Sequence, residues 1–79
     1  MELRELGLQV AQARRALGCT QSELAAAAGL SRQTVSALER GEIGDLGVRK
    51  VLRLLEALDH TLVVRRRGHR LTLDDFAAP

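Results

Sequence analysis

The sequence predicts a mainly α domain of four to five helices, followed by a short C-terminal β-strand or hairpin. The first reason is length, since 79 residues suffice for one domain with a thin core. The second is composition: 46% of the residues are hydrophobic but only 1% are aromatic, which favours interlocking helices over a large ligand cavity, so we expect no cofactor. The third is periodicity, which is helical up to residue 59 and changes afterwards. We therefore divide the chain into residues 1–59 and residues 60–79.

The first helix is predicted to run from near the N-terminus to Gly18, a natural stop. Its apolar residues recur at steps of three and four, so they share one helical face. They are Leu3, Leu6, Val10, Ala13 and Leu17.

The next two helices are short and lie close together in the sequence. Thr20 opens the second helix with Glu23 three residues later, which is the spacing of a capping box, and Gly29 closes it. Ser31 then follows after a single residue and is able to cap a third helix, which ends at Gly41. Two short helices are thus predicted to meet at a tight turn.

The fourth helix is the most apolar segment, and Asp45 is expected to cap it. Its apolar stripe is wider than three short helices can readily cover, so Leu55 and Leu58 are expected at a contact with a second subunit. The stripe consists of Leu46, Val48, Val51, Leu52, Leu54, Leu55 and Leu58.

After residue 60 the chain becomes β-branched and apolar. A hairpin turning at Gly68 would bring Leu62 and Val64 to one face with Leu71 and Leu73. Because an isolated hairpin is marginal in water, we favour a strand that pairs with the same strand of another subunit. The interface would then contain Leu62, Val63 and Val64.

The charge pattern leaves two readings open. The net charge is +2, and eleven of the twelve basic residues are Arg. Arginine binds phosphate well because its planar fork donates two parallel hydrogen bonds. The arginines form either a local basic face or an ordinary solvated surface.

Several classes of protein are disfavoured by what the sequence contains. The single Cys19 cannot form an intrachain disulfide, and charges in the first turns interrupt any secretory signal, so we expect a cytoplasmic protein. No apolar run approaches the roughly 20 residues of a membrane span. Cys19, His60 and His69 have neither metal-ligand spacing nor a nucleophile–base arrangement, so we expect no metal and no enzymatic activity.

The segment TQSELAAAAGLSRQTVSALERG, residues 20–41, places a glycine turn between two short helices with inward apolar positions on both. It closely resembles the lambda-repressor-like (Xre/Cro) helix-turn-helix family, and the match extends from about Leu6 to Leu58. The resemblance implies a sequence-specific DNA-binding transcriptional regulator, with a repressor as the first expectation. The second helix of the motif would lie in the DNA major groove.

Carried onto this sequence, the resemblance assigns the base contacts to Arg32, Gln33, Ser36 and Ala37. The chemistry agrees, because an Arg fork matches the two acceptors of guanine and a Gln amide matches the donor and acceptor of adenine. Taken alone, Arg32 or Gln33 is better explained as an exposed polar residue on a helix, but the two together in this motif favour DNA contact.

The resemblance gives Gln21 two roles, a phosphate contact and a brace for the first base reader. Thr34 and Arg40 are further phosphate candidates. In relatives of this type, residues at the positions of Arg14 and Glu39 form a partly buried ion pair, so we interpret these two as structural.

The segment after the recognition helix departs from the pattern of the relatives, which often carry basic residues there. Glu42 and Asp45 stand in its place, and their repulsion of the DNA backbone would weaken phosphate contacts. Lys50, Arg49 and Arg53 are able to compensate from the fourth helix.

The tail resembles that of HipB-like regulators, antitoxin-type repressors that pair through a short C-terminal strand. This weaker resemblance implies a homodimer and an inverted-repeat operator on double-stranded DNA. The competing hypothesis is a protein-binding module, either an antitoxin that clasps a toxin or a co-regulator that has lost operator binding. Phe76 among small residues is consistent with a docking segment or with a frayed terminus.

Overall fold

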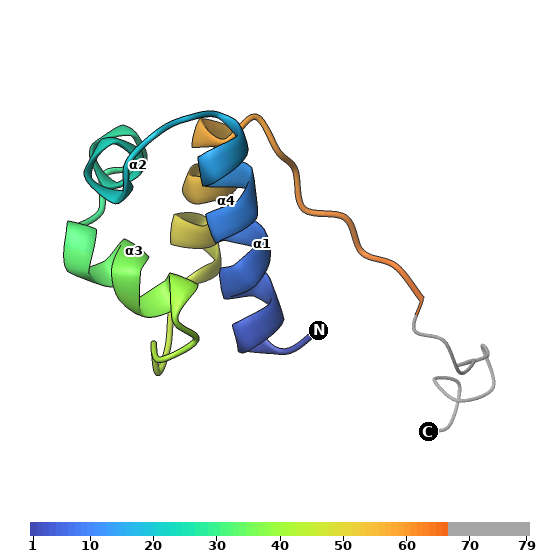
Figure 1. Ribbon diagram of the computed structural model, residues 1–79. Coiled ribbons are helices and arrows are strands. Elements are labelled where there is room, and N and C mark those ends of the chain that lie inside the picture. The colour runs from blue at the N-terminus through green and yellow to red at the C-terminus, as the bar shows by residue number, and fades with distance from the viewer. Residues whose placement is uncertain (67–79) are drawn as a thin grey trace, which may run out of the picture.

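The computed structural model describes residues 1–66. Four helices follow one another in this part of the chain: α1 (Leu3–Ala16), α2 (Gln21–Ala28), α3 (Arg32–Glu39) and α4 (Val48–Ala57) (Figure 1). The prediction of a mainly α fold is therefore confirmed.

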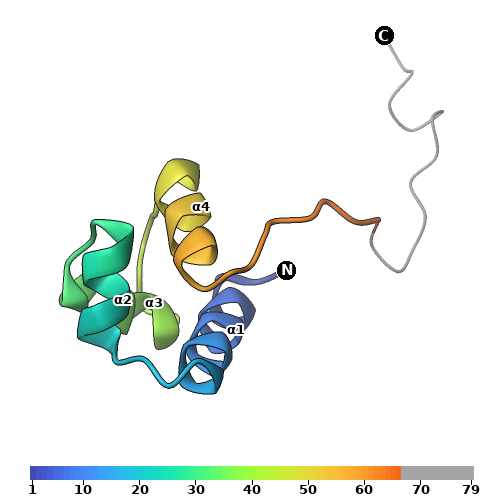
Figure 2. The same cartoon turned by 90° about the horizontal axis from the view of Figure 1, so that it is seen from above.

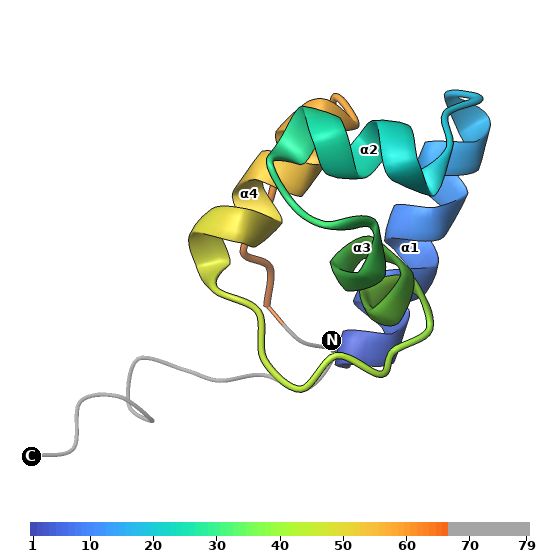
Figure 3. The ribbon, with the colours of Figure 1, turned by 90° about the vertical axis from the view of Figure 1, so that its left-hand side faces the viewer.

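The helices pack around α2, which contacts both α3 and α4, while α1 packs against α3. Figure 3 shows α2 running between the ends of α4 and α1, with α3 beneath it. The helix α3 is therefore held from two directions. The core residues are Val10, Leu24, Ala25, Ala28, Val35, Leu38, Leu54 and Leu58.

The turn between α2 and α3 is set by backbone hydrogen bonds. The Leu30 N–H donates to the Ala25 carbonyl at 2.8 Å, and the Gly29 N–H donates to the Ala26 carbonyl at 3.3 Å, which is the Schellman pattern. Gly29 adopts φ 69°, a left-handed conformation that costs a residue without a Cβ little. This tight reversal leaves only three residues between the end of α2 and the start of α3.

The predicted caps of the two short helices are confirmed, but the cap of α4 is not. The Glu23 N–H donates to Thr20 Oγ1 at 3.0 Å, and the Thr20 N–H donates to the Glu23 carboxylate at 2.9 Å. The hydrogen bond that the Thr20 N–H donates to the carboxylate, followed by a contribution from the Thr20 side chain, lowers the pKa of Glu23. Asp45 was expected to cap α4, but the helix begins at Val48 after Gly47 and has no side-chain cap. The glycine-rich connection extends two residues further than the apolar pattern indicated.

Two apolar residues lie elsewhere than predicted. Leu17 follows the last residue of α1 and is exposed, so it does not share the buried face of that helix. Leu58 was expected at a dimer interface, but its side chain is 1% exposed and belongs to the core. The reason is that Leu54 and Leu58, four residues apart, both point inward from the end of α4.

The segment after α4 leaves the helical body as an extended chain (Figures 1 and 2). Residues 61–66 are exposed and form no strand within the part of the protein that the structure describes. A strand that pairs only between subunits has no ladder partner in a single chain. The alternative hairpin, which needs Leu71 and Leu73, lies outside the described residues.

Gly7 controls how closely α1 approaches α3. It is buried, and a Cβ at this position would overlap the carbonyl oxygen of Leu38. We expect Gly7→Ala to lower the free energy of unfolding by about 1–3 kcal/mol in urea denaturation, despite the better helix propensity of Ala. Gly44→Ala is the control, because nothing lies within 4 Å of a Cβ there, and it should change stability by less than about 0.5 kcal/mol. Equal effects of the two substitutions would contradict this close approach.

Candidate nucleic-acid interface

The N-terminal end of α3 carries the first two predicted base readers into solvent. Ser31 caps the helix, since its Oγ accepts a hydrogen bond from the Thr34 N–H at 3.1 Å and lies 2.9 Å from the Thr34 hydroxyl. Arg32 and Gln33 occupy the first turn, and both are exposed. The first backbone N–H groups of a helix carry partial positive charge, so this end attracts anions.

The opposite side of α3 is committed to the core. Val35 and Leu38 are 0% exposed and fix the rotation of the helix about its own axis. Ser36 and Ala37 follow Gln33 by three and four residues, so they lie one turn further along the same side, where they are half-buried. The structure thus gathers the four predicted base readers on one side of one helix.

The C-terminal end of α3 is anchored through Glu39. Arg14 Nε donates to Glu39 Oε2 at 2.7 Å, and Arg14 Nη2 donates to Glu39 Oε1 at 2.9 Å, which is a bidentate pair between α1 and α3. The side chains of Arg14 and Glu39 are only 12% and 5% exposed. Arg14 Nη1 also donates to the Cys19 carbonyl at 2.9 Å, so one guanidinium ties α3 to both α1 and the loop before α2. Sequence reasoning missed this last bond because a backbone acceptor leaves no mark on the residue pattern.

The electrostatics of the pair favour its charged form. Burial opposes ionisation of the Glu39 carboxyl, but hydrogen bonds from Arg14 and Gln21 and the positive charge of Arg14 outweigh it and lower the pKa of Glu39. The hydrogen bond to Glu39 raises the pKa of Arg14 against the opposing effect of burial. Both groups therefore remain ionised at neutral pH.

Gln21 stands at the first turn of α2 and joins the same network. Its Nε2 donates to Glu39 Oε1 at 3.0 Å, so the amide braces the end of α3. The resemblance implied a brace on the first base reader, but the hydrogen bond that Gln21 makes reaches Glu39 instead. Its position at the N-terminal end of α2 still leaves it beside free backbone N–H groups.

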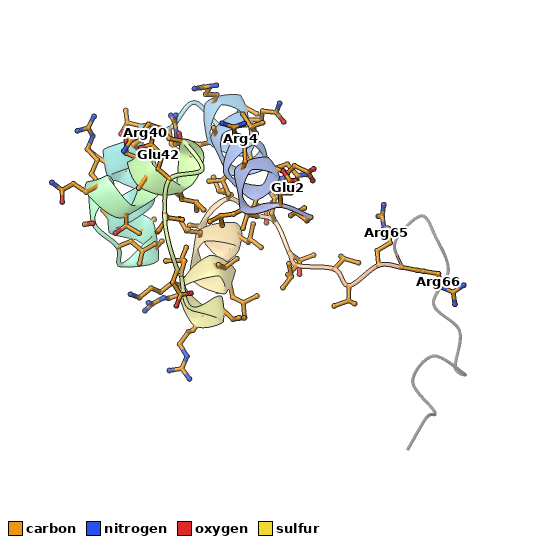
Figure 4. All side chains as sticks on the ribbon, turned by 90° about the horizontal axis from the view of Figure 1, so that it is seen from below. Glu2, Arg4, Arg40, Glu42, Arg65 and Arg66 are labelled. Carbon is orange, nitrogen blue, oxygen red and sulfur yellow. The ribbon has the colours of Figure 1, made fainter. Side chains whose placement is uncertain are left out.

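Arg40, a predicted phosphate contact, lies just beyond the last residue of α3 and is already engaged. Its Nε donates to Glu42 Oε2 at 2.8 Å, and its Nη1 donates to Ser36 Oγ. Figure 4 shows Arg40 and Glu42 side by side near Arg4 of α1. The pairing with Glu42 was not predicted. The sequence does contain a signal for it, because a glycine at the end of a helix favours a tight turn and Gly41 lies between the two charged residues.

The fold and this surface define a helix-turn-helix DNA-binding protein, in which a capped second helix projects donor-rich side chains from its first turn. The model of a helix-turn-helix family matches residues 10–63, and the chain belongs to the lambda-repressor-like (Xre/Cro) helix-turn-helix family. It is a DNA-binding transcriptional regulator. A search of curated protein sequences finds no significant match.

A solved structure agrees with this assignment. The chain is similar to the restriction-modification controller protein C.AhdI from Aeromonas hydrophila, with 34% sequence identity and a TM-score of 0.70. The similarity covers 73% of this chain and 86% of that protein. The two chains therefore share the fold over most of their lengths.

Two structural findings apply to the same described region. Of the helices within residues 1–66, none is long and apolar enough to cross a membrane. No three metal-ligating side chains gather among those residues either.

The Glu39 network predicts a dependence of stability on pH. Because the folded-state pKa of Glu39 lies below its ordinary 4.5, its contribution is fully present above about pH 4.5 and is lost as the pH falls through the lowered pKa. We expect Glu39→Gln to lower the free energy of unfolding by about 1–3 kcal/mol at pH 6, because Arg14 loses its charged partner. Its stability should then fall less than that of the parent between pH 6 and pH 3. Urea denaturation at both pH values measures this.

Glu56→Gln is the matched control, since Glu56 is exposed on α4 and makes no ion pair within the described residues. It should leave stability at pH 6 within about 0.5 kcal/mol of the parent. If Glu39→Gln behaves like this control, the network does not anchor α3.

Proposed function

We propose that the chain binds a specific inverted-repeat operator as a homodimer and represses transcription from it. Each protomer inserts α3 into the major groove, where Arg32, Gln33, Ser36 and Ala37 meet base edges. An Arg fork on guanine and a Gln amide on adenine supply the hydrogen bonds, and Ala37 offers an apolar contact to a thymine methyl group.

The observation that carries this proposal is the division of α3 into an anchored part and a free part. Val35, Leu38 and Glu39 hold the helix to the core, to α1 and to α2. Arg32 and Gln33 have no structural task of that kind and stand exposed at the capped end. A rigid helix with free donors at its N-terminal end matches the way this family enters the groove.

The phosphate contacts are assigned to Gln21, Thr34 and Arg40. Gln21 and Thr34 stand in the first turns of α2 and α3, where the helix dipole favours an anion. An arginine has five N–H donors, and Arg40 uses two of them in hydrogen bonds to Glu42 and Ser36, so donors remain for a phosphate.

The dimer is proposed to form through Leu55, Leu62, Val63 and Val64. Leu62 and Val63 are exposed and Val64 is 96% exposed, although all three are apolar. Leu55 and Leu62 line a groove of about 480 Å³ between α1, the end of α4 and the segment after it. A second copy seated there would cover these side chains and set two α3 helices about one DNA turn apart.

The similarity to C.AhdI favours one regulatory role, that of a restriction-modification controller protein. The identity of 34% over 73% of this chain is the observation behind this second candidate role. A toxin partner stays a prediction from the sequence.

The base readers are tested by selection from a random duplex pool. We expect an enriched inverted repeat with half-sites about 34 Å apart, and Arg32→Ala or Gln33→Ala should weaken binding to it by about tenfold or more because each bidentate base contact is worth about 1–3 kcal/mol. Gln12→Ala, an equally exposed glutamine on α1, should bind as the parent does. Circular dichroism should be the same for all variants. Unchanged affinity of both α3 variants would show that the readers are assigned wrongly.

The dimer is tested by mass in solution at micromolar concentration. The parent should sediment as a dimer, and Val64→Asp should shift it to a monomer, because burying an unpaired carboxylate costs several kcal/mol. Leu17→Asp changes an equally apolar exposed residue at the far end of α1 and should leave the dimer intact. A monomeric parent would contradict the proposed interface.

A further inference from the structure

The turn that follows α3 has a fixed shape. The Glu42 N–H donates to the Ala37 carbonyl and the Gly41 N–H to the Leu38 carbonyl, both at 2.9 Å, and Gly41 takes φ 71°. This is again the Schellman pattern, which leaves Glu42 beside the last turn of the helix. Gly41 also lies against α1, since a Cβ on it would be 3.1 Å from the Arg4 Cα. Glu42 is therefore held in place by backbone structure.

The fixed turn brings the Glu42 carboxylate onto the guanidinium of Arg40. The Arg40 Nε to Glu42 Oε2 distance is 2.8 Å, and the same guanidinium reaches back to Ser36 Oγ (Figure 4). Arg40 thus lies along the side of α3 that carries Ser36. Its positive charge is shared with a carboxylate before any DNA arrives.

We propose that Glu42 is an affinity-setting residue, which holds Arg40 and so weakens its contact with a DNA phosphate. The inference rests on the proposed function. A phosphate that approaches Arg40 must compete with the Glu42 carboxylate for the guanidinium and must also lie near that negative charge. The effect is graded, because the Arg40 and Glu42 side chains are 55% and 63% exposed and an exposed pair is readily displaced.

The Arg40–Glu42 ion pair is distinct from a general effect of acidic residues in this loop. Asp45 carries the same charge three residues later and is also exposed. Within the described residues the ion pairs are Arg14 with Glu39 and Arg40 with Glu42, so Asp45 holds no arginine. Of these two loop carboxylates, Glu42 is the one that is paired with Arg40.

The experiment compares Glu42→Gln with Asp45→Asn, which remove the same charge from the same loop. The probe is the duplex that the parent chain enriches from a random pool. At low salt, Glu42→Gln should bind it about three- to fivefold tighter, and Asp45→Asn should gain less than about twofold. In an Arg40→Ala background the gain from Glu42→Gln should fall to that of Asp45→Asn. The gain should also shrink at high salt.

Each other outcome contradicts the proposal that Glu42 acts by holding Arg40. Equal gains for the two variants would reveal a general charge effect, and a gain that survives Arg40→Ala would show that Glu42 does not act through Arg40. Weaker binding by Glu42→Gln would show that the carboxylate supports the interface. A parent chain that enriches no duplex would instead contradict the proposed function itself and remove the inference with it.

Discussion

The carboxylate of Glu39 joins α1, α2 and α3 through a single set of hydrogen bonds. It is nearly buried at the junction of three helices, and a buried charge is tolerated only when its hydrogen bonds are satisfied. Arg14 supplies two of these bonds and Gln21 a third. Because α1, α2 and α3 each contribute one member, the network forms only when all three helices take their places.

This anchoring explains how a domain with a thin core holds α3 in a fixed position. Val35 and Leu38 fix the rotation of α3, and Glu39 fixes its C-terminal end against α1 and α2. The capped N-terminal end carries Arg32 and Gln33, whose side chains are exposed. The same helix therefore packs into the core with one set of residues and, in the proposed function, meets DNA with another. Preorganisation of this kind lowers the entropy cost of binding.

The sequence predicted the structure correctly where the residues that determine a feature lie close together in the chain. The caps at Thr20 and Ser31 depend on residues three apart, and the pair of Arg14 with Glu39 followed from the family resemblance. It was a poor guide where distant segments meet. The approach of α1 to the Leu38 carbonyl at Gly7 depends on backbone positions set by tertiary packing. The bond from Arg14 to the Cys19 carbonyl is local, and it was missed because a backbone acceptor leaves no mark on the residue pattern. Leu58 was misplaced because a wide apolar stripe does not say which of its members face inward.

The central claim is that the N-terminal end of α3 is the surface that meets DNA. Its most direct test is to follow backbone amide resonances of the protein while the enriched duplex is added. We expect large chemical-shift changes at Arg32, Gln33 and Ser36 of α3 and at Gln21 of α2. Resonances on the outer face of α4 near Leu52 should not change. If the changes were confined to α4 or to residues 60–66 and no resonance of α3 shifted, α3 would not be the DNA-binding surface.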